Sequence, residues 1–250
     1  MSHPEQFKFV EIVKELNKSK LGQRRVLELG SYDVYGEIRS IFSDASEYVG
    51  IDLCDGPGVD VVANAHDLDR LNLGIFDIVL SCEAFEHDPD WRKTLKNAIA
   101  CLGHDGVLIL TCATTLRPEH GTTRTSPKES PGTQSRGWDY YGNVSKTDLI
   151  ETLNSIDPSL DFKIWINRKV FDLYAVITKT TFNSGHYVPP TQEDIDLLIG
   201  STPLRYQCAR WPVRLVAAIF GVKIGETFGR HYWTFLANRL SDGVRAKRTN

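Results

Sequence analysis

RVLELG, residues 25–30, decides the fold predicted for this chain. This apolar run ends at Gly30, and a second apolar run, YVGID at residues 48–52, ends in the carboxylate of Asp52. The layout is a strand, a glycine turn and a second strand that ends in an acid about twenty residues after the turn. Folds with this layout bind adenosine-containing cofactors, because the turn admits the ligand and the acid accepts hydrogen bonds from the ribose hydroxyls.

The turn itself favours a cofactor that carries no phosphate. Residues 30–36 read GSYDVYG, so Tyr32 stands where a dinucleotide turn has its second glycine. A pyrophosphate must touch the backbone at that position, whereas S-adenosylmethionine makes no such demand. An NAD-dependent oxidoreductase is therefore disfavoured, and the chain also lacks a Tyr-x-x-x-Lys pair after its fifth expected strand.

Strand and helix patterns alternate along the first 180 residues. This alternation predicts an α/β fold with a Rossmann-like, doubly wound, mainly parallel seven-stranded sheet, an antiparallel edge hairpin and a C-terminal helical extension. The strands are expected at Arg24–Leu29, Tyr48–Leu53, Val59–Ala63, Phe76–Cys82, Val107–Cys112, Phe162–Asn167 and Val170–Thr178, with a turn at Asp105-Gly106. The helices are expected at 4–20, Val34–Phe42, Pro89–Leu102, Lys146–Ser155 and Glu193–Ile199, and from Leu204 onward.

One long segment breaks this rhythm. Residues 113–143 are rich in Thr, Ser, Pro and Gly, and an insertion of that length in a compact domain is usually a functional lid or disordered. We therefore expect a cofactor-binding domain at residues 1–182, with 113–143 as its lid, and a helical basic extension at 183–250.

The charge of the chain is unevenly distributed. The net charge is −3, yet residues 200–250 carry nine Lys/Arg and two Asp/Glu and end in a polar tail that we expect to fray. This arm suits packing on the acidic body, a homodimer contact through the C-terminal helices, or peripheral contact with an anionic membrane surface. Nucleic acid is a disfavoured partner, because no motif for a flipped base follows the fourth strand.

Cysteine usage and hydropathy bear on location. None of the five cysteines forms a CxxC pair or has a metal-ligand spacing, no run reaches the ~18 apolar residues of a membrane span, and no secretory signal is visible. The sequence thus predicts a cytoplasmic protein with no metal site and no membrane span.

Four stretches resemble the class I S-adenosylmethionine-dependent methyltransferases, of the type that modifies small molecules and sugars. They are VLELG at 26–30, YVGID at 48–52, ANAHDL at 63–68 and FDIVLSCEAFEH at 76–87. The resemblance covers residues 20–180 and implies S-adenosylmethionine as cofactor, with methyl transfer to an oxygen or nitrogen of a small polar acceptor such as a sugar or glycan precursor. Tyr32 departs from the family's glycine turn.

The resemblance also implies cofactor contacts. Glu28 and Gly30 would hold the methionine end, Asp52 the ribose, and Asp67 the adenine amino group. A helix N-terminal acid is the alternative for Asp67. The full expected set is Glu28, Gly30, Ser31, Asp52, Leu53, Ala65, His66, Asp67, Cys82 and Glu83.

Catalytic candidates follow the fourth strand, and substrate candidates lie in the lid. His87 has an ordinary pKa near neutrality and is the expected general base, with Glu86 as a second acid–base group; the alternative is that His87 only orients a loop. Aromatic and polar lid residues suit a sugar or an anionic group. The expected substrate residues are His120, Arg124, Trp138, Tyr140 and Tyr141.

A rival function remains open on the sequence alone. The chain could be a catalytically silent methyltransferase-like protein that binds a partner through its basic arm. Cofactor binding separates the two functions, and the acids Glu28, Asp52 and Asp67 favour the enzyme.

Overall fold

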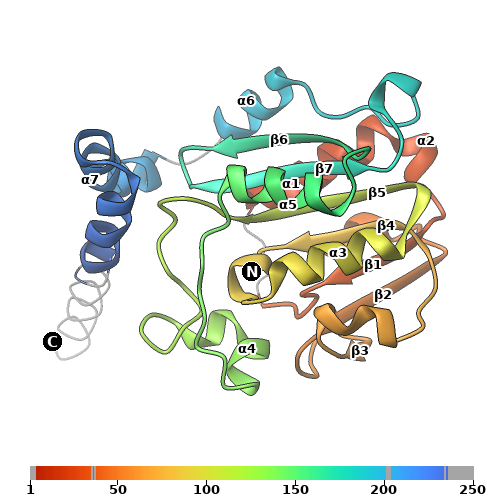
Figure 1. Ribbon diagram of the computed structural model, residues 1–250, viewed down its shortest axis with the longest axis horizontal. Coiled ribbons are helices and arrows are strands. Elements are labelled where there is room, and N and C mark those ends of the chain that lie inside the picture. Colours follow the sequence, from red (N-terminus) through yellow and green to blue (C-terminus); the bar gives the residue numbers. More distant parts are fainter. Residues whose placement is uncertain (1–3, 35, 37, 201–203, 234, 236–250) are drawn as a thin grey trace, which may run out of the picture.

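A seven-stranded sheet forms the centre of the molecule in the computed structural model, which describes residues 4–34, 36, 38–200, 204–233 and 235. The strand order is β3-β2-β1-β4-β5-β7-β6 (Figure 1). The first five strands pair in parallel, and β7 runs antiparallel to β5 and β6. The strands are β1 (Arg25–Leu29), β2 (Glu47–Asp52), β3 (Val61–Val62), β4 (Phe76–Cys82), β5 (Leu102–Ala113), β6 (Asp161–Asn167) and β7 (Asp172–Thr178). The expected doubly wound sheet with an antiparallel edge hairpin is confirmed.

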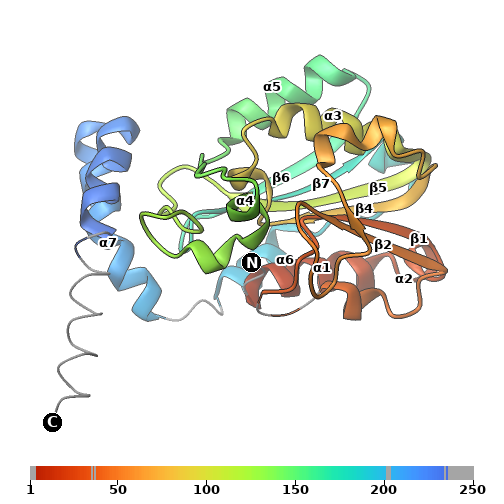
Figure 2. The ribbon, with the colours of Figure 1, turned by 90° about the horizontal axis from the view of Figure 1, so that it is seen from below.

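Helices cover both faces of the sheet (Figure 2). On one face lie α3 (Trp91–Cys101) and α5 (Lys146–Ile156). On the other lie α1 (Pro4–Leu16), α2 (Lys18–Leu21) and α6 (Gln192–Gly200). Because both faces are covered, β4 is apolar along almost its whole length, as expected for a central parallel strand.

Side-chain alternation along β1 divides the core in two. Leu27 and Leu29 pack in the hydrophobic cluster that contains the buried faces of α3 and α5. Val26 packs in the cluster that contains the buried faces of α1 and α6. Since successive strand residues point to opposite faces, Glu28 must share the face of Val26.

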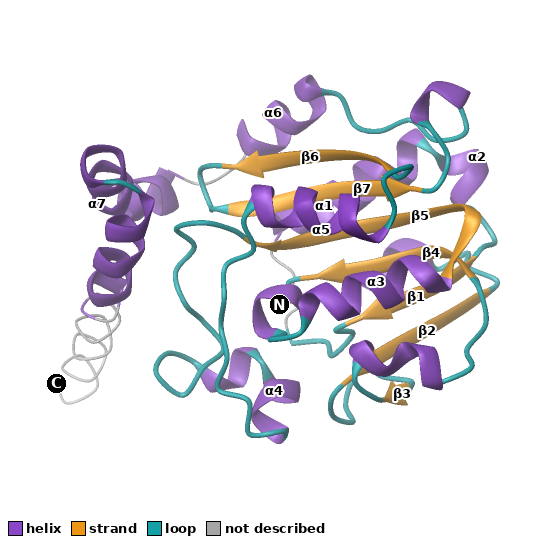
Figure 3. Cartoon of the chain, viewed as in Figure 1, coloured by secondary structure: helices purple, strands orange, loops and turns teal. Residues whose placement is uncertain are grey.

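The C-terminal helices differ in how they join this core. Ile195 and Leu198 of α6 are buried in the same cluster as α1, so residues up to 200 share the core of the sheet. The expected division at residue 182 stays a prediction. Beyond α6, α7 (Leu204–Phe220) lies past the carboxyl ends of the parallel strands (Figure 3), where its Arg210 donates to the carbonyl oxygen of Lys169 at 3.1 Å. Residues 222–233 are again helical, and the tail expected to fray lies outside the described residues. No described helix is long and apolar enough to span a membrane.

Three expected elements differ from those observed. The helix predicted at Val34–Phe42 is only a 3-10 helix, η1 (Ile38–Phe42), because Gly36 has φ +138° and donates its N–H to Asp33 Oδ1 in a turn. The third strand is two residues long and lies at the sheet edge. The turn predicted at Asp105-Gly106 instead lies within β5, where its pairing with β4 shifts register.

A buried ion pair fixes the base of the lid. Nη1 of Arg117, near the start of the lid, donates to Asp172 Oδ1 at 2.6 Å and to the carbonyl oxygen of Val170 at 2.7 Å. The side chain of Arg117 is 6% exposed and that of Asp172 is fully buried. Further on, the lid contains η4 (Pro127–Glu129) and α4 (Pro131–Ser135). The lid is therefore tied to the first residue of β7.

We predict that Asp172→Ala destabilises the protein by about 3–5 kcal/mol, because it leaves the Arg117 guanidinium buried without its closest anion. Glu11→Ala, which breaks the exposed pair between Lys8 and Glu11 on α1, is the control and should cost less than about 1 kcal/mol. Urea-induced unfolding measures both. Similar small losses in the two variants would contradict a structural role for the Arg117–Asp172 pair.

Candidate active site

A pocket opens where β1, β2 and β4 end, the place where open α/β sheets bind ligands. We call it the first pocket. Strand ends and the turns after them line one side, and lid residues line the other. Its lining includes Leu29, Gly30, Tyr32, Val34, Ile51, Asp52, Leu53, Ala63, Asn64, Ala65, Ser81, Glu83, Ala84, Phe85, His87, Asp88, Thr94, Glu129, Ser130, Pro131, Gly132, Thr133 and Trp138.

Gly30 makes the turn that opens this pocket. It has φ +80°, and a Cβ at this position would lie 2.5 Å from the Cβ of Ala84. Its N–H donates to the carbonyl oxygen of Ile51 at 2.9 Å. A side chain here would therefore be strained and would clash with the turn after β4.

Tyr32 replaces the missing glycine and becomes part of the wall. Its N–H donates to Asp52 Oδ2 at 3.0 Å, and its ring lies against Gly56, where a Cβ would come within 2.2 Å of the ring. The departure from the glycine turn thus places an aromatic side chain on the pocket lining.

Asp52 presents a carboxylate at the end of β2. It accepts from the N–H of Tyr32 and, at 2.7 Å, from the N–H of Leu53. Burial raises the pKa of Asp52, and these backbone N–H donors act against that rise. A Cβ on Gly132 of α4 would lie 2.2 Å from Asp52 Oδ1. Gly132 therefore brings the lid backbone directly against this carboxylate.

Half of the expected cofactor residues line the first pocket: Gly30, Asp52, Leu53, Ala65 and Glu83. The other half lie outside its lining: Glu28, Ser31, His66, Asp67 and Cys82.

Two of the residues outside the first pocket, Glu28 and Asp67, have a clear structural reason for their position. Glu28 faces away from Leu27 and Leu29, and its Oε2 accepts from the Tyr48 hydroxyl at 2.7 Å. Asp67 sits at the start of η2 (Ala65–Arg70) and pairs with Arg70 at 3.5 Å and Lys93 at 3.7 Å. This favours the alternative in which Asp67 is a helix N-terminal acid.

Several lining residues were not predicted as cofactor contacts. Asn64 and Ser81 lie inside the quoted motifs and Tyr32 lies in the glycine turn, so proximity to the strand ends was a usable signal. Lid residues 129–133 carried no such signal, because only the folded path of the lid brings them over Asp52.

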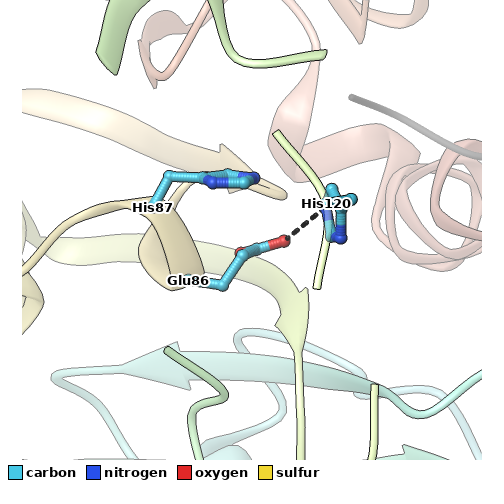
Figure 4. A group of neighbouring side chains, drawn as sticks. All are labelled: Glu86, His87 and His120. Carbon is cyan, nitrogen blue, oxygen red and sulfur yellow. Dashed lines mark ion pairs between the residues drawn. The ribbon is translucent and has the colours of Figure 1, made fainter. Parts of the chain in front are cut away.

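Beside the first pocket, the two expected catalytic residues meet a lid histidine (Figure 4). Glu86 and His87 belong to η3 (Phe85–His87), directly after β4, and His120 comes from the lid. Their ligand atoms lie within 4.8 Å of one another, and Glu86 Oε1 is 3.7 Å from His120 Nε2. Glu83, whose φ is +56°, sets the sharp exit from β4 that leads into this cluster.

Burial controls the charge of the cluster. It raises the pKa of Glu86, and the neighbouring carboxylate of Glu83 adds to that rise. It lowers the pKa of His87 to about 3, and it lowers the pKa of His120, with His87 as a further cause. Burial thus favours the neutral form of both imidazoles, and a catalytic role for His87 stays a prediction.

A second pocket lies on the other side of this cluster, between the lid and the helix after α7. Its lining consists of Leu116, Arg117, Pro118, Glu119, Tyr141, Gly142, Asn143, Glu226, Gly229, Arg230 and Trp233. The ring centroids of His120 and Tyr141 are 5.0 Å apart, and those of His87 and Tyr141 are 5.5 Å apart. Tyr141 thus joins the cluster to the second pocket.

The expected substrate residues divide among three places. His120 and Tyr141 lie at the cluster, and Trp138 lines the first pocket. Tyr140 and Arg124 line neither pocket, and Arg124 pairs instead with Glu119 at 2.7 Å and Asp139 at 2.8 Å. Arg124 therefore holds the lid loop together.

Comparison with known proteins gives a partial family match. Residues 34–110 match the family described as the methyltransferase domain. No curated protein matches the chain.

Solved structures share the fold at low identity. The plantazolicin methyltransferase BamL, solved with a triazolic desmethylPZN analog and SAH, has a TM-score of 0.50 and 12% identity over 81% of this chain and 80% of its own. The 1,6-didemethyltoxoflavin-N1-methyltransferase of Burkholderia thailandensis has a TM-score of 0.45 and 16% identity over 69% and 76%. A SAM-dependent methyltransferase of Archaeoglobus fulgidus has a TM-score of 0.46 and 15% identity over 68% and 93%.

Residues 34–110 thus resemble a methyltransferase domain, and the chain shares the fold of a solved methyltransferase. These similarities do not determine the acceptor.

We predict that Asp52→Ala weakens binding of S-adenosylmethionine at least about tenfold, because it removes the charged acceptor that faces the first pocket. Asp55→Ala removes the same charge from an exposed turn three residues away and should leave the dissociation constant unchanged. Isothermal titration calorimetry measures both. Equal affinities for the two variants would show that Asp52 does not contact the cofactor.

Proposed function

We propose that the protein transfers a methyl group from S-adenosylmethionine to a hydroxyl oxygen of a small polar acceptor, and that a sugar or glycan precursor is the acceptor class. The observation that carries this proposal is the pairing of two pockets across one buried cluster. The first pocket has the features of a cofactor site, and the second offers unpaired polar atoms to a hydroxylated molecule.

The first pocket fits the methyl donor. The cofactor supplies an activated methyl group on a positively charged sulfur. Asp52 would accept the ribose hydroxyls, and the Gly30 turn would admit the methionine end at the end of β1. Apolar side chains such as Ile51, Ala63 and Phe85 suit the flat adenine ring. The strand-end carboxylate would also repel a 2′-phosphate, which disfavours NADP.

The second pocket suits a hydroxylated acceptor. Tyr141 Oη, Asn143 Oδ1 and Trp233 Nε1 are buried and lack a hydrogen-bond partner among the described residues. Buried polar groups are normally hydrogen-bonded, so this concentration of unpaired atoms favours a ligand with several hydroxyls. Trp233 and Tyr141 also offer aromatic faces of the kind that pack on sugar rings.

The cluster between the pockets would hold the reacting oxygen. His87 lines the first pocket, and Tyr141 lines the second. An acceptor that reaches from the second pocket toward His87 would approach the methyl group from one side. Alignment of this kind supplies much of the rate in methyl transfer, since the sulfonium is already a good leaving group.

The proposal is tested with a panel of free sugars, nucleotide-activated sugars and small amines, with release of S-adenosylhomocysteine as the readout. We expect turnover with a hydroxylated member. With that acceptor, Trp233→Phe should raise KM about tenfold, because it removes one hydrogen-bond donor, and leave the affinity for S-adenosylmethionine unchanged. Trp211→Phe changes a 59%-exposed tryptophan of α7 and is the matched control.

Turnover only with amines would overturn the assignment to oxygen. Turnover with a sugar that Trp233→Phe and Trp211→Phe affect equally would place the acceptor outside the second pocket.

A further inference from the structure

Three buried ligand atoms converge from two separate segments of the chain. Glu86 and His87 are held by η3 at the end of β4, and His120 is brought across by the lid. Glu86 is fully buried and His87 is 5% exposed. Both carboxylate oxygens of Glu86, both ring nitrogens of His87 and Nε2 of His120 lack a hydrogen-bond partner within the described part of the chain. Such a concentration of unpaired polar atoms in a protein interior is costly unless something binds there.

The orientation of His120 is a second, independent indication that something binds at this cluster. Its Nδ1 lies 3.2 Å from the carbonyl oxygen of Pro118, and a carbonyl can only accept. Nδ1 therefore carries the proton, and a neutral ring then has a lone pair on Nε2. Nε2 lies 3.7 Å from Glu86 Oε1, beyond hydrogen-bond distance, so the two atoms face each other without a direct hydrogen bond. A histidine bound to a metal has the same arrangement, with its far N–H donated to a backbone carbonyl.

The backbone around the cluster keeps it in place. Gly121 follows His120 with φ +72°, and a Cβ there would lie 2.6 Å from Cε1 of His87. Only a glycine lets the lid pass so close to the imidazole. The N–H of Gly142 donates to the carbonyl oxygen of Glu86 at 2.8 Å, which fixes the segment that carries Tyr141 against the same turn.

We infer that Glu86, His87 and His120 bind a divalent metal ion between the two pockets. One carboxylate and two neutral imidazoles form a ligand set that Zn²⁺, Mn²⁺ or Fe²⁺ prefers and that Mg²⁺ and Ca²⁺ do not. Three protein ligands leave at least one coordination position for a ligand from outside the chain. The expectation of no metal rested on cysteine spacing, and this cluster contains no cysteine.

The role of the ion rests on the proposed function. An ion at this position would attract a hydroxyl oxygen of the acceptor and stabilise the negative charge that develops as the hydroxyl proton passes to water. Metal binding and S-adenosylmethionine binding are measured separately, so that the metal site and the proposed function can each be overturned without the other.

The first experiment measures bound metal directly. The full chain is stripped with a chelator, and Zn²⁺ and Mn²⁺ are titrated by calorimetry, with bound metal counted by mass spectrometry. We expect one ion per chain, and an affinity that falls at least about a hundredfold in His120→Ala and in Glu86→Gln. His104→Ala removes an exposed histidine from β5 and should bind as the unmodified chain does.

A spectrum of the unmodified chain guards against variants that fail to fold. Co²⁺ added to the stripped protein should give the visible absorption of a low-symmetry site with nitrogen ligands, and Zn²⁺ should displace it. A folded chain that binds S-adenosylmethionine but no ion would overturn the metal site and leave the proposed function standing. Metal binding that survives His120→Ala would also overturn it. A chain that binds the ion but shows no affinity for S-adenosylmethionine would support the metal site and overturn the proposal that S-adenosylmethionine is the methyl donor.

Discussion

The buried ion pair between Arg117 and Asp172 is the constraint on which the site depends. It joins the start of the lid to the first residue of β7, and Glu83, at the exit of β4, lies 3.8 Å from the same guanidinium. Two charges in a dry interior hold their positions firmly, because separating them leaves each without compensation. This pair therefore fixes where the lid leaves the sheet, and with it the approach of His120 to Glu86.

The geometry of parallel strands supplies the other half of the site. Gly30, Asp52 and the turn after Cys82 come from three strands that end at the same edge of the sheet, so residues far apart in the sequence line one pocket. The lid then covers this edge, and its Gly132 lies against Asp52.

Burial gives the cluster between the pockets its chemistry. On the surface, Glu86 would be an anion, and His87 and His120 would titrate near neutrality. Inside the protein, burial disfavours each charged form, so it raises the pKa of Glu86 and lowers the pKa of both imidazoles. The second pocket adjoins this cluster through Tyr141, and Tyr141 Oη and Trp233 Nε1 have no hydrogen-bond partner among the described residues.

The sequence by itself determined the sheet, the glycine turn and the acid at the end of β2, because strand periodicity and a short turn are local properties that neighbouring residues impose. It also located the lid, and it singled out Glu86, His87 and His120 one by one. Only the tertiary structure decided that these three meet, that Glu28 turns toward Tyr48, and that residues 129–133 close over Asp52. Those outcomes depend on the path of a long loop and on which strand face is buried, and contacts between distant segments leave no periodic trace in the chain.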